Sequence, residues 1–245
     1  LIVIGGLGFL VWRDVVRCRF RFSKLQLHTR LVLTVTGILL GGGWLLFLLF
    51  ERNAALAGLR PGGKALSALF LAVTPRTAGF NTVDMAQLSE SGNLLTNVLM
   101  LIGGSPGSTA GGIKTTTAAV LLLSTFASGR GSTRVHAFRY SIDRDTIRQA
   151  SSILLTYLSM STAAILAICC LDPVSLKAAM FEVNSAIATV GLSLGVTPAL
   201  SAPSHIILIL LMYAGRIGGL TFVLLFAQRR SDPPLDRPSG KLLIG

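Results

Sequence analysis

The chain has 245 residues, of which 51% are hydrophobic and 13% charged, and its mean hydropathy is +0.69. These values are typical of a multi-pass membrane protein and exclude an ordinary soluble domain. The net charge of +12 does not indicate nucleic-acid binding, because the Lys and Arg residues cluster in separate regions. Six lie between Arg13 and Arg30, five between Arg130 and Arg148, and four after Phe226. Such clusters mark cytoplasmic loops. We therefore expect a protein of the cell membrane (inner or plasma membrane) whose basic loops and tail 229–245 face the cytoplasm.

The sequence opens, at Leu1, inside an apolar segment. Residues 1–12 contain the glycine cluster Gly5, Gly6 and Gly8. We expect residues 1–30 to be the end of a preceding repeat and a cytoplasmic loop. The sequence would then be the C-terminal part of a longer protein.

The next segments form a first unit, 31–130. Leu31 to Phe50 gives twenty residues without a charge, and about 20 apolar residues span a bilayer. Ala65 to Thr74 is apolar but too short to cross, which favours a re-entrant helix. Asn93 to Phe126 is long enough to cross but is interrupted at Gly103 to Gly112.

The second unit, 131–228, repeats this order. Ser151 to Leu171 is a full span, Leu176 to Ala188 is a short apolar segment, and His205 to Gln228 is a span interrupted by Arg216. A shift of 112 residues aligns Thr77-Ala78-Gly79 with Thr189-Val190-Gly191. We therefore expect an all-α integral membrane fold of repeated helix–pore loop–helix units, with four full crossings and two re-entrant helices.

The two Thr-x-Gly loops are candidates for an ion selectivity filter. Such filters replace the ion's hydration shell with backbone carbonyl oxygens, and glycine allows backbone angles that other residues disfavour. The simpler alternative is two ordinary glycine turns beside buried interfacial helices. The predicted filter residues are Thr77, Ala78, Gly79, Phe80 and Asn81 in the first unit, and Thr189, Val190, Gly191, Leu192 and Ser193 in the second.

The interruption between the two halves of Asn93 to Phe126 cannot form a regular helix, because it is rich in glycine and contains a proline. We expect an intramembrane gate; the alternative is a helix-packing surface of small residues. The predicted gate residues are Gly103, Gly104, Ser105, Pro106, Gly107, Ser108, Thr109, Ala110, Gly111 and Gly112, together with Lys114 and Arg216.

Two enzyme patterns overlap this run. Gly103-x-Ser105-x-Gly107 fits a nucleophile elbow, which leaves an intramembrane serine hydrolase as an alternative. Gly107 to Thr115 resembles a phosphate-binding loop but lacks the required Gly-Lys pair. We expect no enzyme activity, since none of the three histidines lies near this run in the expected topology.

Three charged residues complete the candidate site. Arg216 is expected in mid-span, where a charge normally faces a cavity or a partner. Lys114 follows the gate run and is expected to extend to the cytoplasmic interface. Glu182 precedes the second loop by seven residues, and we expect it to brace that loop by hydrogen bonding.

The two Thr-x-Gly loops, together with the run from Gly103 to Thr117, resemble the Trk/Ktr/HKT superfamily of potassium transporters, and most of all the membrane subunits of bacterial Ktr and Trk systems. The resemblance covers nearly the whole chain. It implies four repeats around one K⁺ pathway, of which this chain would hold the third, the fourth and the end of the second. It also places the filter in the Thr-x-Gly loops, the gate at residues 103–112, and Arg216 beside the gate.

The resemblance further implies inward K⁺ transport driven by the membrane potential, with Na⁺ or H⁺ as candidate coupling ions and no cofactor in this chain. Both loops carry glycine at Gly79 and Gly191, which favours K⁺; a sodium-permeable member of the family is the alternative. The implied partners are the lipid bilayer, a second membrane subunit in a homodimer, and a cytoplasmic nucleotide-binding ring of the RCK type.

Overall fold

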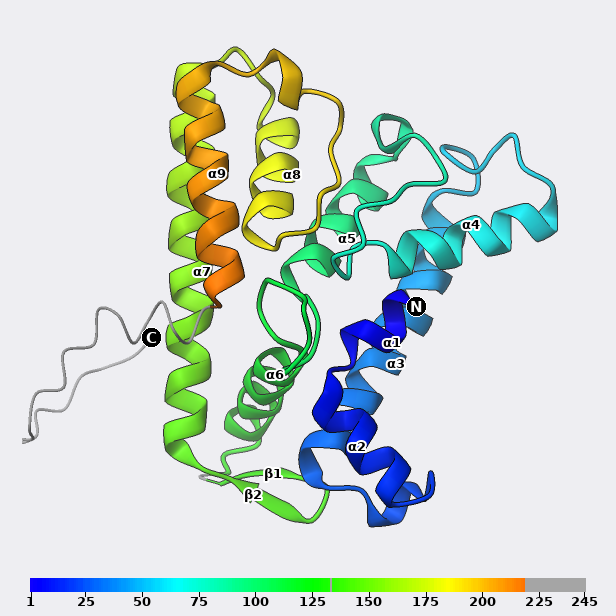
Figure 1. Ribbon diagram of the computed structural model, residues 1–245, viewed down its shortest axis with the longest axis vertical. Helices are drawn as coiled ribbons and strands as arrows, with labels where there is room; N and C mark the ends of the chain where they lie inside the picture. Colours follow the sequence, from blue (N-terminus) through cyan, green and yellow to red (C-terminus); the bar gives the residue numbers. More distant parts are fainter. Residues whose placement is uncertain (133, 219–245) are drawn as a thin grey trace, which may run out of the picture.

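The computed structural model describes residues 1–132 and 134–218 (Figure 1). This part of the chain is predominantly helical, as expected. The helices are α1 (Ile2–Gly6), α2 (Phe9–Arg17), α3 (Leu27–Phe50), α4 (Pro61–Val73), α5 (Glu90–Leu101), α6 (Thr115–Gly129), α7 (Arg144–Leu171), α8 (Leu176–Ile187) and α9 (Ala202–Ile217). Three short 3-10 helices are η1 (Phe22–Lys24), η2 (Met85–Gln87) and η3 (Thr197–Ala199).

Two of the described helices, α3 and α7, are long and apolar enough to span a membrane. Both begin earlier than the sequence pattern predicts, at Leu27 and Arg144, because their first turns contain polar residues that an apolar run excludes. The predicted span from Asn93 to Phe126 becomes two shorter helices, α5 and α6, separated by the glycine-rich loop. The end of the predicted span His205–Gln228 and the tail 229–245 lie outside the described residues.

Helices α4 and α8 have 13 and 12 residues. At about 1.5 Å per residue they reach about 20 Å, less than the roughly 30 Å of a hydrocarbon core. Helix α4 starts at Pro61, whose missing N–H costs nothing at a first helical position. The Ser175 side chain caps α8 by accepting a hydrogen bond from Ala178 N, so both short helices have a defined start.

The helices pack as two groups that meet where α5 contacts α8 and where α6 contacts α7. Helix α4 packs against α3, while α8 packs between α7 and α9, and α5 contacts α8 across the boundary. In Figure 1, α9 lies beside the upper part of α7, and the loop between α5 and α6 is near the centre of the molecule. Phe181, Val190 and Leu192 belong to the same buried cluster as residues of α3 and α4, so the core continues across the boundary.

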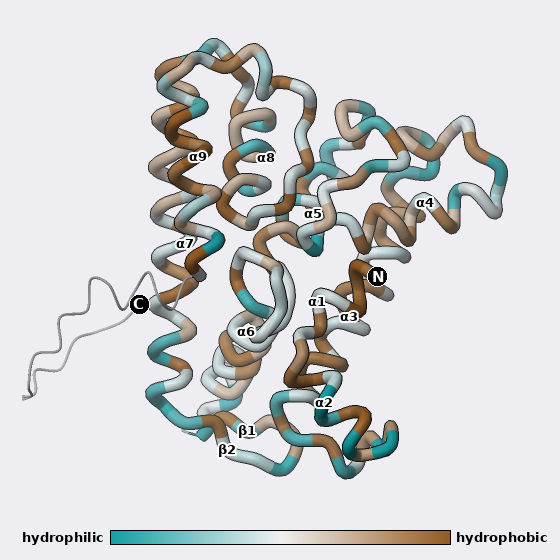
Figure 2. Tube along the Cα trace, in the orientation of Figure 1, coloured by the Kyte–Doolittle hydropathy of each residue, from teal (hydrophilic) through white to brown (hydrophobic). Residues whose placement is uncertain are grey.

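A short antiparallel hairpin departs from the all-α expectation. Strand β1 (Val135–Ala137) pairs with β2 (Tyr140–Ile142) just before α7. Phe138 at its tip makes an edge-to-face contact with Phe22, with ring centroids 6.3 Å apart. Hydrophilic residues gather at this end of the molecule (Figure 2), which is where two of the basic clusters lie.

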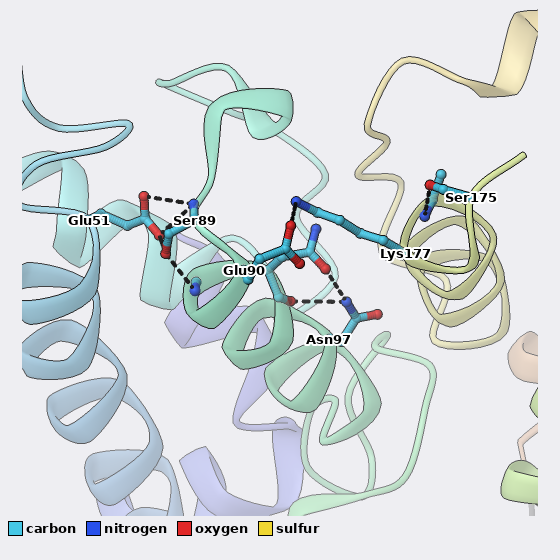
Figure 3. Close-up of polar contacts among 9 residues, drawn as sticks. Glu51, Ser89, Glu90, Asn97, Ser175 and Lys177 are labelled. Carbon is cyan, nitrogen blue, oxygen red and sulfur yellow. Dashed lines mark hydrogen bonds and ion pairs between the residues drawn. The ribbon is translucent and has the colours of Figure 1, made fainter.

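Helices α3 and α7 are each followed by an acidic residue that accepts hydrogen bonds from the start of another helix, α5 after α3 and α9 after α7. Glu51 is fully buried and accepts hydrogen bonds from Ser89 N and Ser89 Oγ, at 3.1 and 2.6 Å (Figure 3). Asp172 accepts from Ser201 N and Ser201 Oγ, each at 3.0 Å, and from Ser204 Oγ. Ser89 and Ser201 are the N-cap residues of α5 and α9. The bonds of Glu51 therefore join the end of α3 to the start of α5, and those of Asp172 join the end of α7 to the start of α9.

Candidate functional site

The two Thr-x-Gly loops have the same backbone pattern. Thr77 and Gly79 both have positive φ, 59° and 72°, and Thr189 and Gly191 repeat this with 54° and 91°. Positive φ is uncommon for a residue with a side chain and costs roughly 1–2 kcal/mol. Its recurrence at Thr77 and Thr189, two residues before a left-handed glycine, makes two unrelated glycine turns a poor explanation.

The two loops also face each other closely. A Cβ atom added to Gly79 would lie 2.5 Å from the Val190 carbonyl oxygen, and one added to Gly191 would lie 3.7 Å from Gly79 Cα. The structure therefore brings the predicted filter stretches of the two units together at the boundary between them. Phe80 and Asn81 are exposed on the first loop, and Gly191 is exposed on the second.

Each loop has its own hydrogen-bonding support. Glu182 is 5% exposed and accepts hydrogen bonds from Ser193 Oγ at 2.6 Å, Leu194 N at 3.0 Å and Thr197 Oγ1 at 2.7 Å. In the first unit the Thr74 hydroxyl donates to the Phe80 carbonyl. Sequence inspection suggested Glu182 but missed Thr74, because a threonine at a helix end carries no distinctive signal.

A cavity of about 490 Å³ lies between α8, the second loop and α9. Its lining includes Thr189, Gly191 and Ser193 of the loop, and Met212 and Arg216 of α9. The second Thr-x-Gly loop therefore borders open space on the side of α9.

The glycine-rich loop between α5 and α6 is closed at its base by backbone hydrogen bonds. Gly103 N donates to Ile113 O at 2.9 Å, and Ile113 N donates to Leu101 O at 3.0 Å. Inside the loop, Ser108 Oγ donates to Ser105 O at 2.6 Å. The hydroxyl groups thus satisfy backbone groups that a regular helix would have paired.

The loop lies directly beneath the second Thr-x-Gly stretch. A Cβ atom added to Gly111 would lie 2.3 Å from Thr189 Oγ1 and 2.8 Å from Ala188 O, so only a residue without a side chain fits at Gly111. This close approach brings the predicted gate residues and the predicted filter residues of the second unit into contact.

Two cations donate to carbonyl groups of the same loop. Arg216 Nη1 donates to Thr109 O, and Lys114 Nζ donates to Ala110 O. The Lys114 ammonium group thus turns back toward the loop with which it was grouped, and its expected approach to the cytoplasmic interface stays a prediction. Arg216 is the second-last residue of α9, and its predicted distance from the far end of the span involves residues outside those described.

The N-terminal segment also holds this loop, which the sequence pattern did not reveal. Ser105 N donates to Gly6 O at 2.9 Å, and Phe9 N donates to Gly107 O at 3.4 Å. The break between α1 and α2 therefore contacts the loop between α5 and α6. Two backbone hydrogen bonds between segments about a hundred residues apart leave no mark in composition or periodicity.

Arg76 is a second feature that sequence inspection missed. It is 3% exposed, immediately precedes the first Thr-x-Gly stretch, and donates from Nη2 to Thr36 Oγ1 at 3.3 Å. Its Nε and Nη1 atoms have no hydrogen-bond partner in the described part of the chain. In the sequence it lies outside the three clusters of basic residues and carries no other signal.

The geometry around Ser105 does not resemble a hydrolase. Ser105 is fully buried, and its hydroxyl accepts a hydrogen bond from Thr115 Oγ1 at 3.1 Å. His205, on α9, pairs instead with Ser201 O at 3.0 Å. The Ser105 hydroxyl is therefore held as part of the loop structure.

Two long apolar helices, two short apolar helices that each lead into a Thr-x-Gly loop, and a glycine-rich break in contact with the second loop are features of a helical membrane transport protein. A family model described as TrkH, cation transport protein, matches residues 1–233. The chain therefore belongs to the TrkH cation transport protein family. This confirms the resemblance to the Trk/Ktr/HKT superfamily and the expectation of a transport protein rather than an enzyme.

Several curated relatives are similar over the whole chain. The potassium/sodium uptake protein NtpJ of Enterococcus hirae is 39% identical over 252 residues, covering 100% of this chain and 56% of that protein. The Ktr system potassium uptake protein B of Vibrio alginolyticus is 39% identical and that of Bacillus subtilis 38%, with 54% and 55% of those proteins covered. The chain thus spans about half the length of these relatives.

The fold is similar to that of a solved structure. The potassium transporter TrkH from Vibrio parahaemolyticus matches with a TM-score of 0.72 at 19% identity, over 92% of this chain and 50% of that chain. This likeness supports the helical membrane fold.

Proposed function

We propose that the protein carries K⁺ inward across the cell membrane through a pathway lined by backbone carbonyl groups of its Thr-x-Gly loops. In an extended strand, successive carbonyl groups point to opposite sides. A left-handed residue at every second position turns them toward a common side, and rings of such carbonyls replace the hydration shell of K⁺. The single observation that supports this most is the repeated φ pattern of two loops that face each other.

In this proposal the filter consists of residues 77–81 and 189–193, and Glu182 braces the second stretch through its three hydrogen bonds. The loop 103–112 would be the gate on the inner side of the filter, and the close approach of Gly111 to Thr189 supports this assignment. Arg216 and Lys114 hold the gate by donating to its carbonyls, and the charge of Arg216 opposes a permeating cation at this level.

The proposal extends to topology and partners. The basic segments 13–30 and 130–148 would face the cytoplasm and offer the docking surface for a nucleotide-binding ring of the RCK type, with two membrane subunits in the assembly. Two of the relatives are named as proteins of a Ktr system, which supports a multi-component assembly. The membrane potential would drive uptake, with Na⁺ or H⁺ as candidate coupling ions.

A sodium-permeable transporter is the second candidate. The E. hirae relative is named for sodium as well as potassium uptake. Glycine at both Gly79 and Gly191 favours K⁺, so K⁺ is the primary proposal.

The deciding experiment is uptake of Rb⁺ and Na⁺ into proteoliposomes that contain the whole protein, with and without Gly191→Ser. Saturable Rb⁺ uptake that excludes Na⁺, and that loses this preference in the variant, supports the K⁺ filter. Equal uptake of Na⁺ and Rb⁺ by the unmodified protein would favour the second candidate. Absence of any cation flux from folded protein with its cytoplasmic partner present would disprove the proposal.

A further inference from the structure

A buried chain of polar side chains runs through the short helix α8. Asn184 Nδ2 donates to Asn97 Oδ1 on α5 at 2.8 Å, and Asn184 Oδ1 accepts from Ser161 Oγ on α7 at 2.8 Å. Asn97 is 2% exposed, Asn184 4% and Ser161 5%. Asn97, labelled in Figure 3, in turn donates to the side chain and backbone carbonyl oxygens of Asn93.

These hydrogen-bonded polar side chains fix α8 to helices on both sides. Its bonds join α5 of the first unit, α8, and α7 of the second unit. In an apolar environment no water replaces a lost partner, so a buried amide strongly prefers the helix orientation that satisfies it. Rotation of α8 about its axis would break both bonds of Asn184 at once.

The same turn of α8 holds the start of the second loop. Ala188 N donates to Asn184 O at 3.0 Å, Thr189 N to Ala186 O at 3.0 Å, and Val190 N to Ser185 O at 2.9 Å. The backbone carbonyl groups of three consecutive residues, beginning at Asn184, therefore set the path of the chain into Thr189. A change in the orientation of α8 at Asn184 passes directly to the loop.

In the first unit the corresponding helix, α4, is positioned in a different way. Under the 112-residue shift, Ala72 of α4 corresponds to Asn184. Close packing positions α4 here, because a Cβ atom added to Gly43 of α3 would lie 3.2 Å from the Ala72 Cβ atom. The hydrogen bonds among Asn97, Asn184 and Ser161 therefore have no counterpart at Ala72 and belong to α8 and the second loop.

We propose that the Asn97–Asn184 bridge, anchored by Ser161, is a positioning element that sets the ion preference of the second Thr-x-Gly loop. This inference rests on the proposed K⁺ transport function. Asn184 acts through the orientation of α8, while the loop carbonyls contact the ion. Loss of the bridge loosens the geometry of the loop, so discrimination between K⁺ and Na⁺ declines more than the maximal rate.

The test compares Asn184→Leu, Asn97→Leu, the double variant and Ser161→Ala in the whole protein. Rb⁺ uptake is measured in cells lacking other K⁺ uptake systems, with Na⁺ as competitor and protein levels checked in the membrane. We expect the preference for Rb⁺ over Na⁺ to fall by about threefold to tenfold, the range that corresponds to an interhelical hydrogen bond in a membrane. The maximal Rb⁺ rate should stay within about twofold. The Asn97→Leu, Asn184→Leu double variant should be no worse than the worse single variant, since each single variant already removes the Asn97–Asn184 bond.

The chain offers a matched control between the same two helices. Lys177 Nζ on α8 binds Glu90 Oε1 on α5 at 2.9 Å, and the Glu90 side chain is 84% exposed (Figure 3). Lys177→Gln breaks this surface contact between α5 and α8 and should leave the ion preference unchanged. Ser161→Thr keeps the hydroxyl and should behave like the unmodified protein, and Ser161→Ala is a mild variant if the leucine substitutions reduce folding.

The outcomes separate this inference from the proposed function. An unaltered ion preference in Asn184→Leu or Ser161→Ala, at normal protein levels, overturns the positioning role while K⁺ uptake by the unmodified protein stands. An equal loss in Lys177→Gln also overturns it, because general contact between α5 and α8 would then be the cause. Absence of Rb⁺ uptake by the unmodified protein overturns the proposed function and this inference with it.

Discussion

Gly79 and Gly191 share a left-handed backbone but differ in the space around them. A Cβ atom at Gly79 would lie 2.5 Å from the Val190 carbonyl oxygen, whereas one at Gly191 would meet only Gly79 Cα, at 3.7 Å. Gly191→Ala therefore costs mainly the backbone penalty of about 1 kcal/mol. Gly79→Ala adds a steric conflict with the opposite loop.

We accordingly predict that Gly79→Ala lowers Rb⁺ uptake by about tenfold or more, the factor that about 1.4 kcal/mol represents. Gly191→Ala should lower it less and should mainly reduce the preference over Na⁺. Uptake kinetics with Na⁺ competition, at matched protein levels, provide the measurement. Equal effects of the two substitutions would show that the contact between the loops has no role in transport.

Glu182 gives a second prediction at the scale of a residue. Glu182→Leu leaves the donors of Ser193, Leu194 and Thr197 without their acceptor, and an unsatisfied buried donor costs about 1–3 kcal/mol. We expect a lower thermal unfolding temperature in detergent and reduced selectivity. Glu182→Gln keeps one acceptor oxygen and should lie between the unmodified protein and Glu182→Leu. A Glu182→Leu protein with unchanged unfolding temperature and selectivity would contradict the bracing role.

At the scale of elements, the bonds from Asp172 to Ser201 and Ser204 fasten the start of α9 to the end of α7. The hydrogen bonds from Ser204 and Ser201 hold the pKa of Asp172, which lies just outside α7, below its usual value. A lowered pKa in the folded protein means that the carboxylate contributes stability above the unfolded pKa of about 3.9. This contribution is lost as pH falls through the lower pKa of the folded state.

We therefore predict that Asp172→Asn lowers the thermal unfolding temperature at neutral pH, and that the difference from the unmodified protein shrinks below about pH 4. Unfolding curves in detergent across this pH range are the measurement. Asp143→Asn is a control, because Asp143 is the N-cap residue at the other end of α7 and makes no side-chain cap hydrogen bond there. A constant difference at all pH values would exclude the carboxylate charge as the cause.

At the scale of the whole molecule, Arg216 links α9 of the second unit to the loop of the first unit. Arg216→Gln removes the positive charge and weakens the hold on Thr109 O. We predict a maximal Rb⁺ uptake rate at least about twofold higher, because a cation barrier at the gate is removed. Lys177→Gln, which removes a cation from the exposed pair with Glu90, should leave the rate unchanged. An unchanged or lower rate for Arg216→Gln would contradict the barrier.

The sequence predicted the helices that depend on the length of apolar runs, such as α3, α4, α7 and α8, because hydrophobic length is a property of consecutive residues. It also marked both Thr-x-Gly loops through their repetition. It missed contacts that depend on how distant segments pack, including Asn97 with Asn184 and Ser105 with Gly6. It grouped Lys114 with the loop but could not give its hydrogen-bond partner, because the position of a residue after the loop does not show that its side chain turns back to Ala110 O.

The base of the loop 103–112 has a further consequence for the path of the chain. Hydrogen bonds of Gly103 with Ile113, and of Thr115 N with Gly104 O at 3.1 Å, bring the two ends of the loop side by side. The loop is therefore a side branch of the α5–α6 connection, and its tip adds nothing to the distance between those helices. Residues inserted near Ser108 would leave this base, and with it the register of α6 against α7, in place, and would instead displace the carbonyl groups of Gly107 and Thr109 that Phe9 and Arg216 bind.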